Sequence, residues 1–386
     1  MSTQEDIEFE VEIDEPTEHN IRRDRLAQAV MYTADWTVET AISQLKQGNI
    51  FLQPSFQRRD AWLVERKSRL IESILLGLPI PQIVLAERKD QRGTFIVLDG
   101  KQRLLTLLQF VGEAHGSPNN SFRLRGVEVL TEYKGMAFSE LDIDAKREFL
   151  NYAIRSSVIR NWPDSAFLEI VFVRLNEGSV KLSPQELRQG ISPGPFTSYL
   201  EKASAESLPL RALLKLDAPD FRMRDAELLL RLIAFSRHGA EYRGNMKDFL
   251  DMTTDRTNTE WSTVEHSIVQ LSKEIDAAIA FGMDTFQSTK FGRKWLSDRY
   301  EAPLNRAVLE VQVAGFLDPR IRSMLSSMQP KVVAEFQRMS ETSEFNRSVE
   351  TTTKSLSSTR ARFGHWGEAM RQLTSGLVSM PKIGND

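Results

Sequence analysis

The clearest hydrophobic pattern of the chain lies over residues 94–110, where an apolar run gives way to a helical repeat. Residues 95–98 are all apolar, as expected of a short strand that is buried on both faces. Asp99 and Gly100 interrupt this run. Beyond them, apolar residues recur at the spacing of one helix face, at Leu104, Leu105, Leu107, Leu108 and Val111. The sequence therefore predicts a strand, a tight turn and a helix in direct succession.

The pattern on either side of this unit predicts a mixed α/β domain. Two apolar runs, 83–87 and 94–98, flank a polar turn and predict an antiparallel hairpin. A helix is expected to begin at Thr37 and to stop at Gly48. The other expected elements are a helix over 68–76, strands over 122–130 and 152–159, and helices over 139–150, from Asp164 to Gly178 and from Ser183 onward.

From about residue 195 the hydrophobic pattern is helical nearly to the end of the chain. No strand pattern of comparable strength occurs there. The fold class expected is therefore α+β, with an α/β domain over residues 21–194 and an all-helical domain over 195–386. The clearest predicted helices of the second domain are Ala226–Phe235, Trp261–Phe281, Pro303–Phe316, Val332–Met339 and Leu356–Leu377.

The composition is that of an ordinary globular protein, with 41% hydrophobic and 27% charged residues among 386. The chain has no cysteine, which excludes disulfides, cysteine nucleophiles and thiolate zinc sites. No apolar run reaches the roughly 18 residues that a membrane-spanning helix needs, and the acidic N-terminus is unlike a signal peptide. We expect a soluble cytoplasmic protein.

The net charge of −3 conceals an uneven distribution, because residues 1–18 hold eight acidic residues and no Lys or Arg. Without those eight, 50 basic residues face 45 acidic ones. Residues 1–20 are therefore expected to form a disordered, solvated acidic tail. The alternative is that this tail mimics nucleic acid and shields a basic groove.

The predicted turn at residues 99–103 carries the features of an anion site. Gly100 suits a backbone with positive φ or one that approaches a ligand closely. The amides of Lys101 to Arg103 start a helix and lack partners within it, and two cationic side chains stand beside them. A phosphate is the expected anion. The alternative is an ordinary Asp-Gly turn whose Lys and Arg only coat the first helical turn.

Two further stretches supply candidate site residues. Gln57 and Arg58 lie in an extended segment before Trp62 and bring polar donors close together. Arg174 and Asn176 lie near the end of a predicted helix, where they could face the anion. The next helix begins Ser183-Pro-Gln-Glu186, which is a capping box, so capping alone accounts for Glu186.

Several common catalytic motifs are missing from the sequence. It contains neither G-x-x-x-x-G-K-[ST] nor G-x-G-x-x-G, so neither a P-loop nor a Rossmann dinucleotide site is supported. The five histidines are too scattered to form a metal pair by spacing. A metal ion would have to arrive with a nucleotide.

Four motifs, in this order, resemble the N-terminal domain of GmrSD-type (type IV) restriction endonucleases, a ParB/sulfiredoxin-like group with a DGxQR motif. Lys101 stands where that family usually has Gln, and the HNH nuclease domain that usually accompanies the family is not visible in this sequence. The resemblance covers roughly residues 35–190. The motifs are FQRRDAW at 56–62, LIESILLGLPIPQIVL at 70–85, VLDGKQRLLTLLQF at 97–110 and VFVRLNEGSVKLSPQELR at 171–188.

The resemblance implies a nucleotide-hydrolysing site with Asp99, Gln102 and Arg103 as its catalytic residues. Asp99 would hold Mg²⁺ or orient water, and Gln102 would donate hydrogen bonds. Lys101 and Arg103 would neutralise phosphate charge. The residues implied to contact the nucleotide are Gln57, Arg58, Gly100, Lys101, Arg103, Arg174 and Asn176.

Two classes of function remain open at this stage. One is an NTPase, using GTP or ATP with Mg²⁺, that serves a prokaryotic anti-phage or DNA-restriction system. The other is a nucleotide- or DNA-sensing module that hydrolyses nothing and controls a separate nuclease subunit. Candidate partners are nucleotide, DNA, a nuclease or effector subunit and a second copy of the chain, and no membrane is expected.

Overall fold

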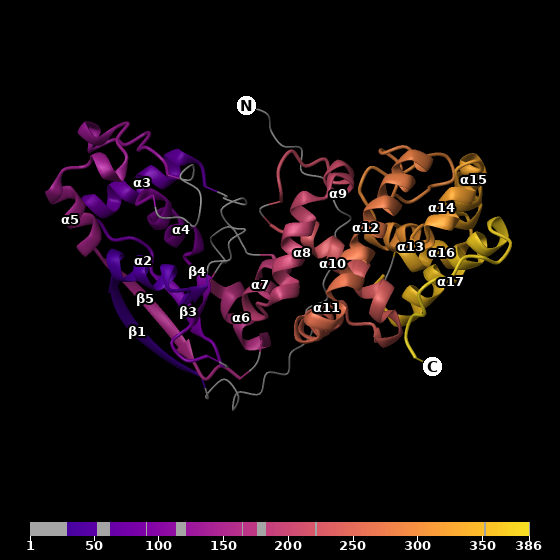
Figure 1. The fold of residues 1–386 in the computed structure, drawn as a ribbon, viewed down its shortest axis with the longest axis horizontal. Helices are drawn as coiled ribbons and strands as arrows, with labels where there is room; N and C mark the ends of the chain where they lie inside the picture. The colour runs from indigo at the N-terminus through magenta and orange to yellow at the C-terminus, as the bar shows by residue number, and fades with distance from the viewer. Residues whose placement is uncertain are drawn as a thin grey trace. The chain divides into compact units, whose positions relative to one another are not determined.

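The computed structural model describes residues 29–51, 62–89, 91–112, 121–163, 165–175, 183–220, 222–350 and 353–385 (Figure 1). The chain divides into two compact units, of which the first ends at Ile191 and the second begins at Ser192. The first unit mixes strands and helices and the second is helical, which confirms the predicted fold class. The predicted acidic tail over residues 1–20 lies outside the described residues.

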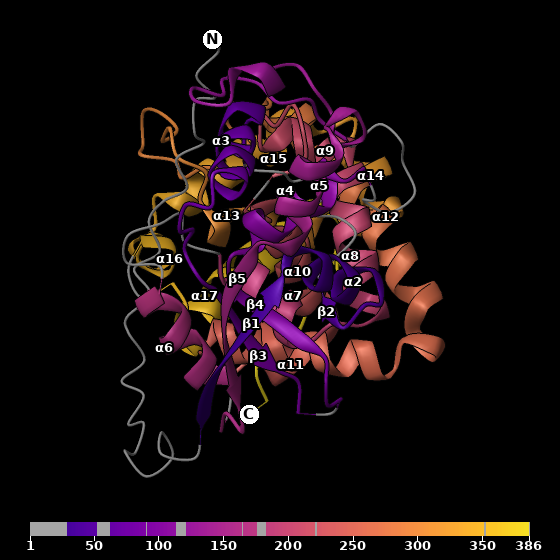
Figure 2. The same ribbon diagram turned by 90° about the vertical axis from the view of Figure 1, so that its left-hand side faces the viewer.

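A five-stranded sheet with the order β1-β5-β3-β4-β2 forms the centre of the first unit. The predicted hairpin is confirmed, because β3 and β4 pair antiparallel. β1 pairs antiparallel with β5 and occupies one edge of the sheet (Figure 2). The strands are β1 (Val30–Thr37), β2 (Ile50–Phe51), β3 (Ile83–Glu87), β4 (Phe95–Asp99) and β5 (Ala153–Arg160).

Side chains of the central strands alternate between two separate cores, as a sheet covered on both faces requires. Phe95 of β4 belongs to one core and Ile96 to the other. The first core also contains residues of α2 (Val38–Lys46), α3 (Val64–Leu75), α4 (Lys101–Phe110) and α5 (Ile143–Asn151). The second core contains Phe167 and Leu168 of α6 (Ser165–Leu175). The predicted burial of β4 on both faces is therefore confirmed.

Helix boundaries in this unit follow local capping signals. The side chain of Thr37 accepts a hydrogen bond from the backbone N–H of Thr40, so α2 begins where the sequence predicts. The last helix of the unit, α7 (Pro184–Ile191), begins with the predicted capping box. Ser183 N–H donates to Glu186 Oε2 at 2.8 Å, and Glu186 N–H donates to Ser183 Oγ at 3.1 Å.

The strand predicted over residues 122–130 is wrong, because this segment is irregular. Leu124 makes backbone hydrogen bonds with Gly135 and Met136, and four further amides of the segment donate to side chains of α3. Glu72 Oε1 accepts three hydrogen bonds of 2.7–2.9 Å, from the amides of residues 128, 129 and 130. Ser68 Oγ accepts another from the amide of Arg125. The alternating pattern thus reflects a loop held against a helix.

Replacing Glu72 with glutamine should destabilise the first unit by about 1 kcal/mol at neutral pH, because charged acceptors make stronger hydrogen bonds than neutral ones. Burial raises the pKa of the Glu72 carboxyl, but the three amides and Arg69 outweigh it and hold that pKa below its ordinary value of 4.5. The carboxylate therefore contributes stability above pH 4.5 that is lost as the pH falls through the lowered pKa.

Urea unfolding of wild type and Glu72→Gln at several pH values measures this contribution. The stability difference between them should shrink below pH 4.5. Glu65→Gln, on the exposed face of α3, is the matched control and should change little. A difference that stays constant down to strongly acidic pH would show that the carboxylate charge is not what holds the loop.

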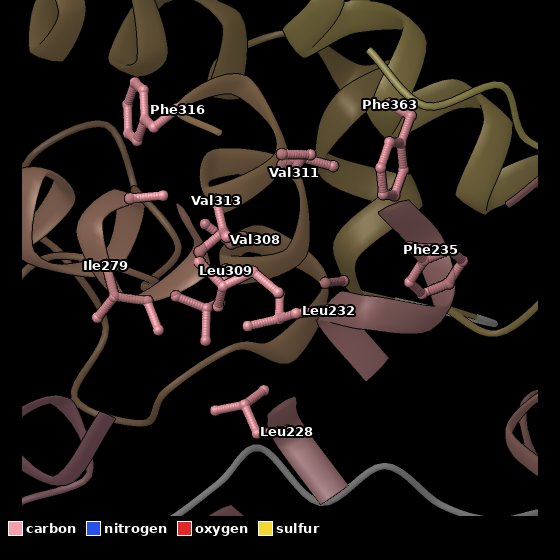
Figure 3. Close-up of a cluster of buried hydrophobic side chains, with 14 of the residues drawn as sticks. Leu228, Leu232, Phe235, Ile279, Val308, Leu309, Val311, Val313, Phe316 and Phe363 are labelled. Atoms are coloured by element: carbon pink, nitrogen blue, oxygen red, sulfur yellow. The ribbon is translucent and has the colours of Figure 1, made fainter. Parts of the chain in front are cut away.

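The second unit is built from helices around one large hydrophobic core (Figure 3). Leu228, Leu232 and Phe235 of α10 meet Ile279 of α12 and Leu309 of α13 in this core. All five helices predicted for this unit are confirmed within a few residues at their ends. The helices are α8 (Pro195–Glu206), α9 (Leu208–Leu213), α10 (Arg224–His238), α11 (Met246–Thr259), α12 (Trp261–Phe286), α13 (Arg306–Gly315), α14 (Pro319–Leu325), α15 (Gln329–Ser340), α16 (Ser343–Glu350) and α17 (Leu356–Leu373).

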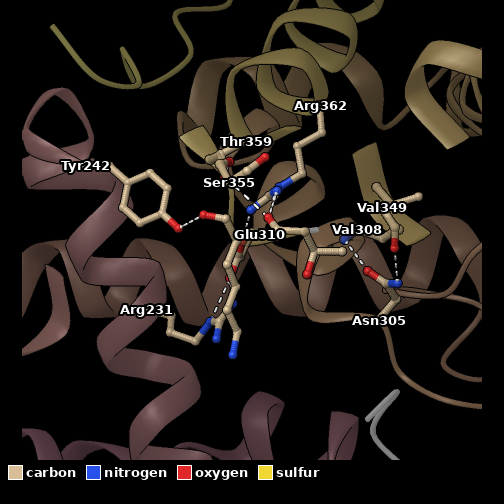
Figure 4. A network of polar contacts seen from close by, with 11 residues as sticks. Arg231, Tyr242, Asn305, Val308, Glu310, Val349, Ser355, Thr359 and Arg362 are labelled. Atoms are coloured by element: carbon tan, nitrogen blue, oxygen red, sulfur yellow. Dashed lines mark hydrogen bonds and ion pairs between the residues drawn. The ribbon is translucent and has the colours of Figure 1, made fainter. Parts of the chain in front are cut away.

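A buried ion triad crosses this core and joins α10, α13 and α17 (Figure 4). Glu310 Oε1 lies 2.6 Å from a guanidinium nitrogen of Arg231, and Glu310 Oε2 accepts a hydrogen bond from Arg362 at 3.0 Å. The three side chains are 0–3% exposed. Beside them, Tyr242 donates a hydrogen bond to the carbonyl of Lys354, and burial raises its pKa to about 12. One carboxylate therefore compensates two buried cations.

Candidate functional site

The predicted turn between β4 and α4 adopts the conformation expected of its glycine. Gly100 is the N-cap of α4 with φ 94° and ψ 8°, in the left-handed region. A Cβ atom at this position would lie 2.9 Å from Cγ1 of Ile83 and 3.3 Å from a guanidinium nitrogen of Arg103. Both the backbone angle and the space available therefore require glycine. We call residues 99–103 the DG turn.

Both carboxylate oxygens of Asp99 are engaged within the DG turn. Oδ1 accepts a hydrogen bond of 2.7 Å from the amide of Gly100, and Oδ2 accepts one of 2.7 Å from Arg103. The Asp99 side chain is 28% exposed and that of Arg103 is 12% exposed. Asp99 therefore holds the turn and faces solvent in part.

Arg103 links the DG turn to the neighbouring strand, a contact that the sequence analysis missed. The same nitrogen that contacts Asp99 donates to the carbonyl of Gln82 at 3.0 Å. The Gln82 side chain accepts a hydrogen bond from Ser157 of β5. β3 and β4 change register between Val84 and Leu85, opposite the end of β4, and such bulges redirect side chains at sheet edges. The sequence motif PIPQ at residues 79–82, directly before β3, was the only signal that could have pointed to this contact.

The first turn of α4 offers backbone donors. Within the described part of the chain, nothing accepts a hydrogen bond from the backbone N–H of Gln102 or Arg103. Gly100 has no side chain that could cap these donors. The side-chain oxygen of Gln102 is buried and likewise has no partner there. The helix start thus presents unsatisfied polar groups together with its positive dipole end.

Lys101 reaches a residue that is distant in sequence. Its Nζ lies 2.9 Å from Oε1 of Glu186, and the two side chains are 11% and 7% exposed. The capping function predicted for Glu186 is confirmed, and this ion pair adds to it. The α7 helix also buries Gln185, Arg188 and Gln189. Among these, Arg188 donates to Gln185 Oε1 at 2.6 Å.

Among the described residues, two ion pairs lie at the start of α4, Asp99 with Arg103 and Lys101 with Glu186. Their formal charges sum to zero. These two ion pairs therefore add no net charge beside the backbone donors and the dipole of α4.

Of the remaining predicted site residues, Arg174 is the one that lies among the described residues. Arg174 is exposed near the end of α6, and no hydrogen bond or ion pair joins it to the DG turn within the described ranges. α6 itself lies against β4. Gln57, Arg58 and Asn176 lie outside the described residues, so their predicted contacts stay predictions.

Magnesium binding was also predicted, with Asp99 as its protein ligand. Across the residues that the structure describes, no group of three or more His, Asp or Glu side chains is arranged to hold a metal ion. Mg²⁺ in nucleotide sites is commonly bound by one or two carboxylates together with phosphate oxygens. A single partly exposed carboxylate at the end of β4 fits that role.

Comparison with known families identifies the first unit. Residues 38–191 match the family described as the GmrSD restriction endonuclease, N-terminal domain. This part of the chain is therefore a domain of the GmrSD N-terminal family, which confirms the resemblance carried by the four motifs. No curated protein and no solved structure matches the chain significantly. The predicted likeness to ParB and sulfiredoxin stays a prediction.

Among the described residues, none of the helices combines the length and apolar character that crossing a bilayer requires.

Proposed function

We propose that the DG turn binds the phosphates of a nucleoside triphosphate and that the chain is the nucleotide-dependent component of a DNA-restriction system. The family of residues 38–191, named for a restriction endonuclease, supports the setting. The observation that carries the nucleotide assignment is the uncapped start of α4, where the amides of Gln102 and Arg103 have no described acceptor. Such helix starts bind phosphate in many unrelated proteins.

In this proposal the backbone performs the recognition of phosphate. Gly100 adopts the left-handed conformation that lets the chain turn into α4, and it adds no side chain of its own beside the first amides. Arg103 is held by Asp99 and by the Gln82 carbonyl, so its charge lies beside the helix start before any ligand arrives. The phosphate would therefore meet donors that need little rearrangement.

Hydrolysis would require a group that orients the attacking water. Asp99 is the candidate, because its carboxylate is partly exposed at the lip of the DG turn. Bound together with the nucleotide, Mg²⁺ would supply neutralisation of phosphate charge, with Asp99 as its protein ligand. Gln102 would donate hydrogen bonds from its side-chain amide.

A second candidate function is supported by the contacts of Asp99. Both of its oxygens are occupied by the turn itself, which is what an anchoring residue requires. Under this alternative the domain binds nucleotide or DNA without hydrolysing it and controls a separate nuclease subunit. Recognition of DNA and a nuclease partner are part of both proposals, since both serve restriction.

Phosphate release by the full-length protein with GTP, ATP or CTP and Mg²⁺, with and without DNA, separates the two functions. Nucleotide binding is measured in parallel, for example by a fluorescent analogue. Release above the no-enzyme rate would support the NTPase, and binding without release would support the sensing module. Neither binding nor release with any nucleotide would contradict the NTPase and the nucleotide-sensing module, and would leave only a module that senses DNA.

A further inference from the structure

We propose that Glu186 is a positioning residue of the nucleotide site, which fixes the Lys101 ammonium beside the start of α4. This inference rests on the proposed nucleotide function of the DG turn. The observation behind it is the Lys101–Glu186 ion pair of 2.9 Å, which joins residues 85 positions apart in the chain.

Glu186 is a rigid anchor because its two oxygens have different partners. Oε2 accepts a hydrogen bond from the backbone amide of Ser183, and the backbone amide of Glu186 donates one to Ser183 Oγ. The hydrogen bond from the Ser183 amide holds the carboxylate against the first turn of α7. Oε1 is then left to face Lys101. A carboxylate that served only as a cap would not need to reach a cation on another helix.

The anchored carboxylate of Glu186 restricts the position of the Lys101 ammonium. A lysine ammonium sits on a flexible four-carbon stem and loses rotamer freedom when it is held in one place. Glu186 imposes that restriction before the ligand binds, so a phosphate meets a cation already in position. Lys101 is also the first residue of α4, directly beside the amides of Gln102 and Arg103.

The contribution of Glu186 should therefore depend on Lys101. We expect Glu186→Gln to raise the dissociation constant for a magnesium nucleotide about tenfold. Glutamine keeps the capping box, since either Glu or Gln serves at that position. In a Lys101→Gln background the same substitution should change the dissociation constant by less than about twofold, because no ammonium is left to position. Glu186→Asp should recover part of the affinity.

Ser183→Ala is the matched control. It removes the hydroxyl that accepts a hydrogen bond from the Glu186 amide. The backbone amide of residue 183 still donates to Glu186 Oε2, so the carboxylate and its contact with Lys101 are retained. We expect it to lower the melting temperature by about 2–4 °C, the effect of losing an N-cap, with an unchanged dissociation constant.

The measurement is a titration of the four proteins of this cycle, and of Ser183→Ala, with fluorescent analogues of GTP, ATP and CTP. Tighter or unchanged binding by Glu186→Gln would overturn the inference. An equal loss of affinity in the wild-type and Lys101→Gln backgrounds would also overturn it, since Glu186 would then act through α7 and not through Lys101. A wild type that binds none of the three analogues would overturn the proposed nucleotide function and this inference together, whereas the other two outcomes leave the proposed function standing.

Discussion

Replacing Asp99 with asparagine is expected to lower nucleotide hydrolysis about a hundredfold or more, the range found for loss of a positioned acid or base. Asparagine has nearly the same shape and can still accept the hydrogen bond from the Gly100 amide. It cannot keep the ion pair with Arg103, whose nitrogen lies 2.7 Å from Oδ2. Nucleotide binding should survive, because the amides of the first turn of α4 are unchanged.

Arg103→Ala separates binding from turnover in the same assay. It removes a charged donor beside the helix start, so nucleotide affinity should fall by about 1.5–3 kcal/mol, the size of a charge-assisted hydrogen bond. Asp35→Asn, on the edge strand β1 of the same sheet, is the matched control and should leave both quantities unchanged. Hydrolysis by Asp99→Asn at the wild-type rate, together with normal binding by Arg103→Ala, would place the active site elsewhere.

The second large effect concerns stability, where Glu310→Ala should cost about 3–5 kcal/mol. The substitution leaves Arg231 and Arg362 buried without their shared carboxylate, and both are no more than 3% exposed. Burial already lowers the pKa of the Arg362 guanidinium, which Glu310 opposes by attraction. An unpaired buried cation is among the most destabilising features a protein interior can contain.

Urea unfolding followed by the helical circular dichroism signal measures this loss. Glu368→Ala, which breaks an exposed pair with Arg371 on α17, should change stability by less than about 1 kcal/mol. Replacing all three members of the triad by apolar residues of similar volume should restore most of the stability. A Glu310→Ala protein as stable as wild type would show that the triad contributes nothing to the fold.

The parts of the fold that follow local patterns could be predicted from the sequence. The hairpin of β3 and β4 and the start of α4 were predicted because apolar runs, a glycine and a helical repeat adjoin one another. The strand predicted over 122–130 failed because its backbone partners are Glu72 and Ser68, two side chains of a distant helix. β1 was missed, since polar residues alternate along this edge strand and no flanking turn signal marks it.

In the candidate site, too, features set by neighbouring residues could be predicted and features set by contacts between distant elements could not. The positive φ of Gly100 and the capping role of Glu186 were predictable from nearby residues alone. The Lys101–Glu186 pair and the contact of Arg103 with the Gln82 carbonyl were not, because they depend on how separate elements meet. No periodicity or motif in the sequence predicts that the starts of α4 and α7, which are 85 residues apart, lie close enough for this ion pair.

Hydrogen–deuterium exchange of the full-length protein, with and without saturating magnesium nucleotide, tests most directly whether phosphate binds at the DG turn. Binding is verified in the same sample by the fluorescent analogue. The account predicts that exchange slows in peptides covering residues 100–103, because the amides of Gln102 and Arg103, which have no acceptor among the described residues, acquire phosphate acceptors. Bound nucleotide with unchanged exchange over residues 100–103, and protection confined to other segments, would contradict it.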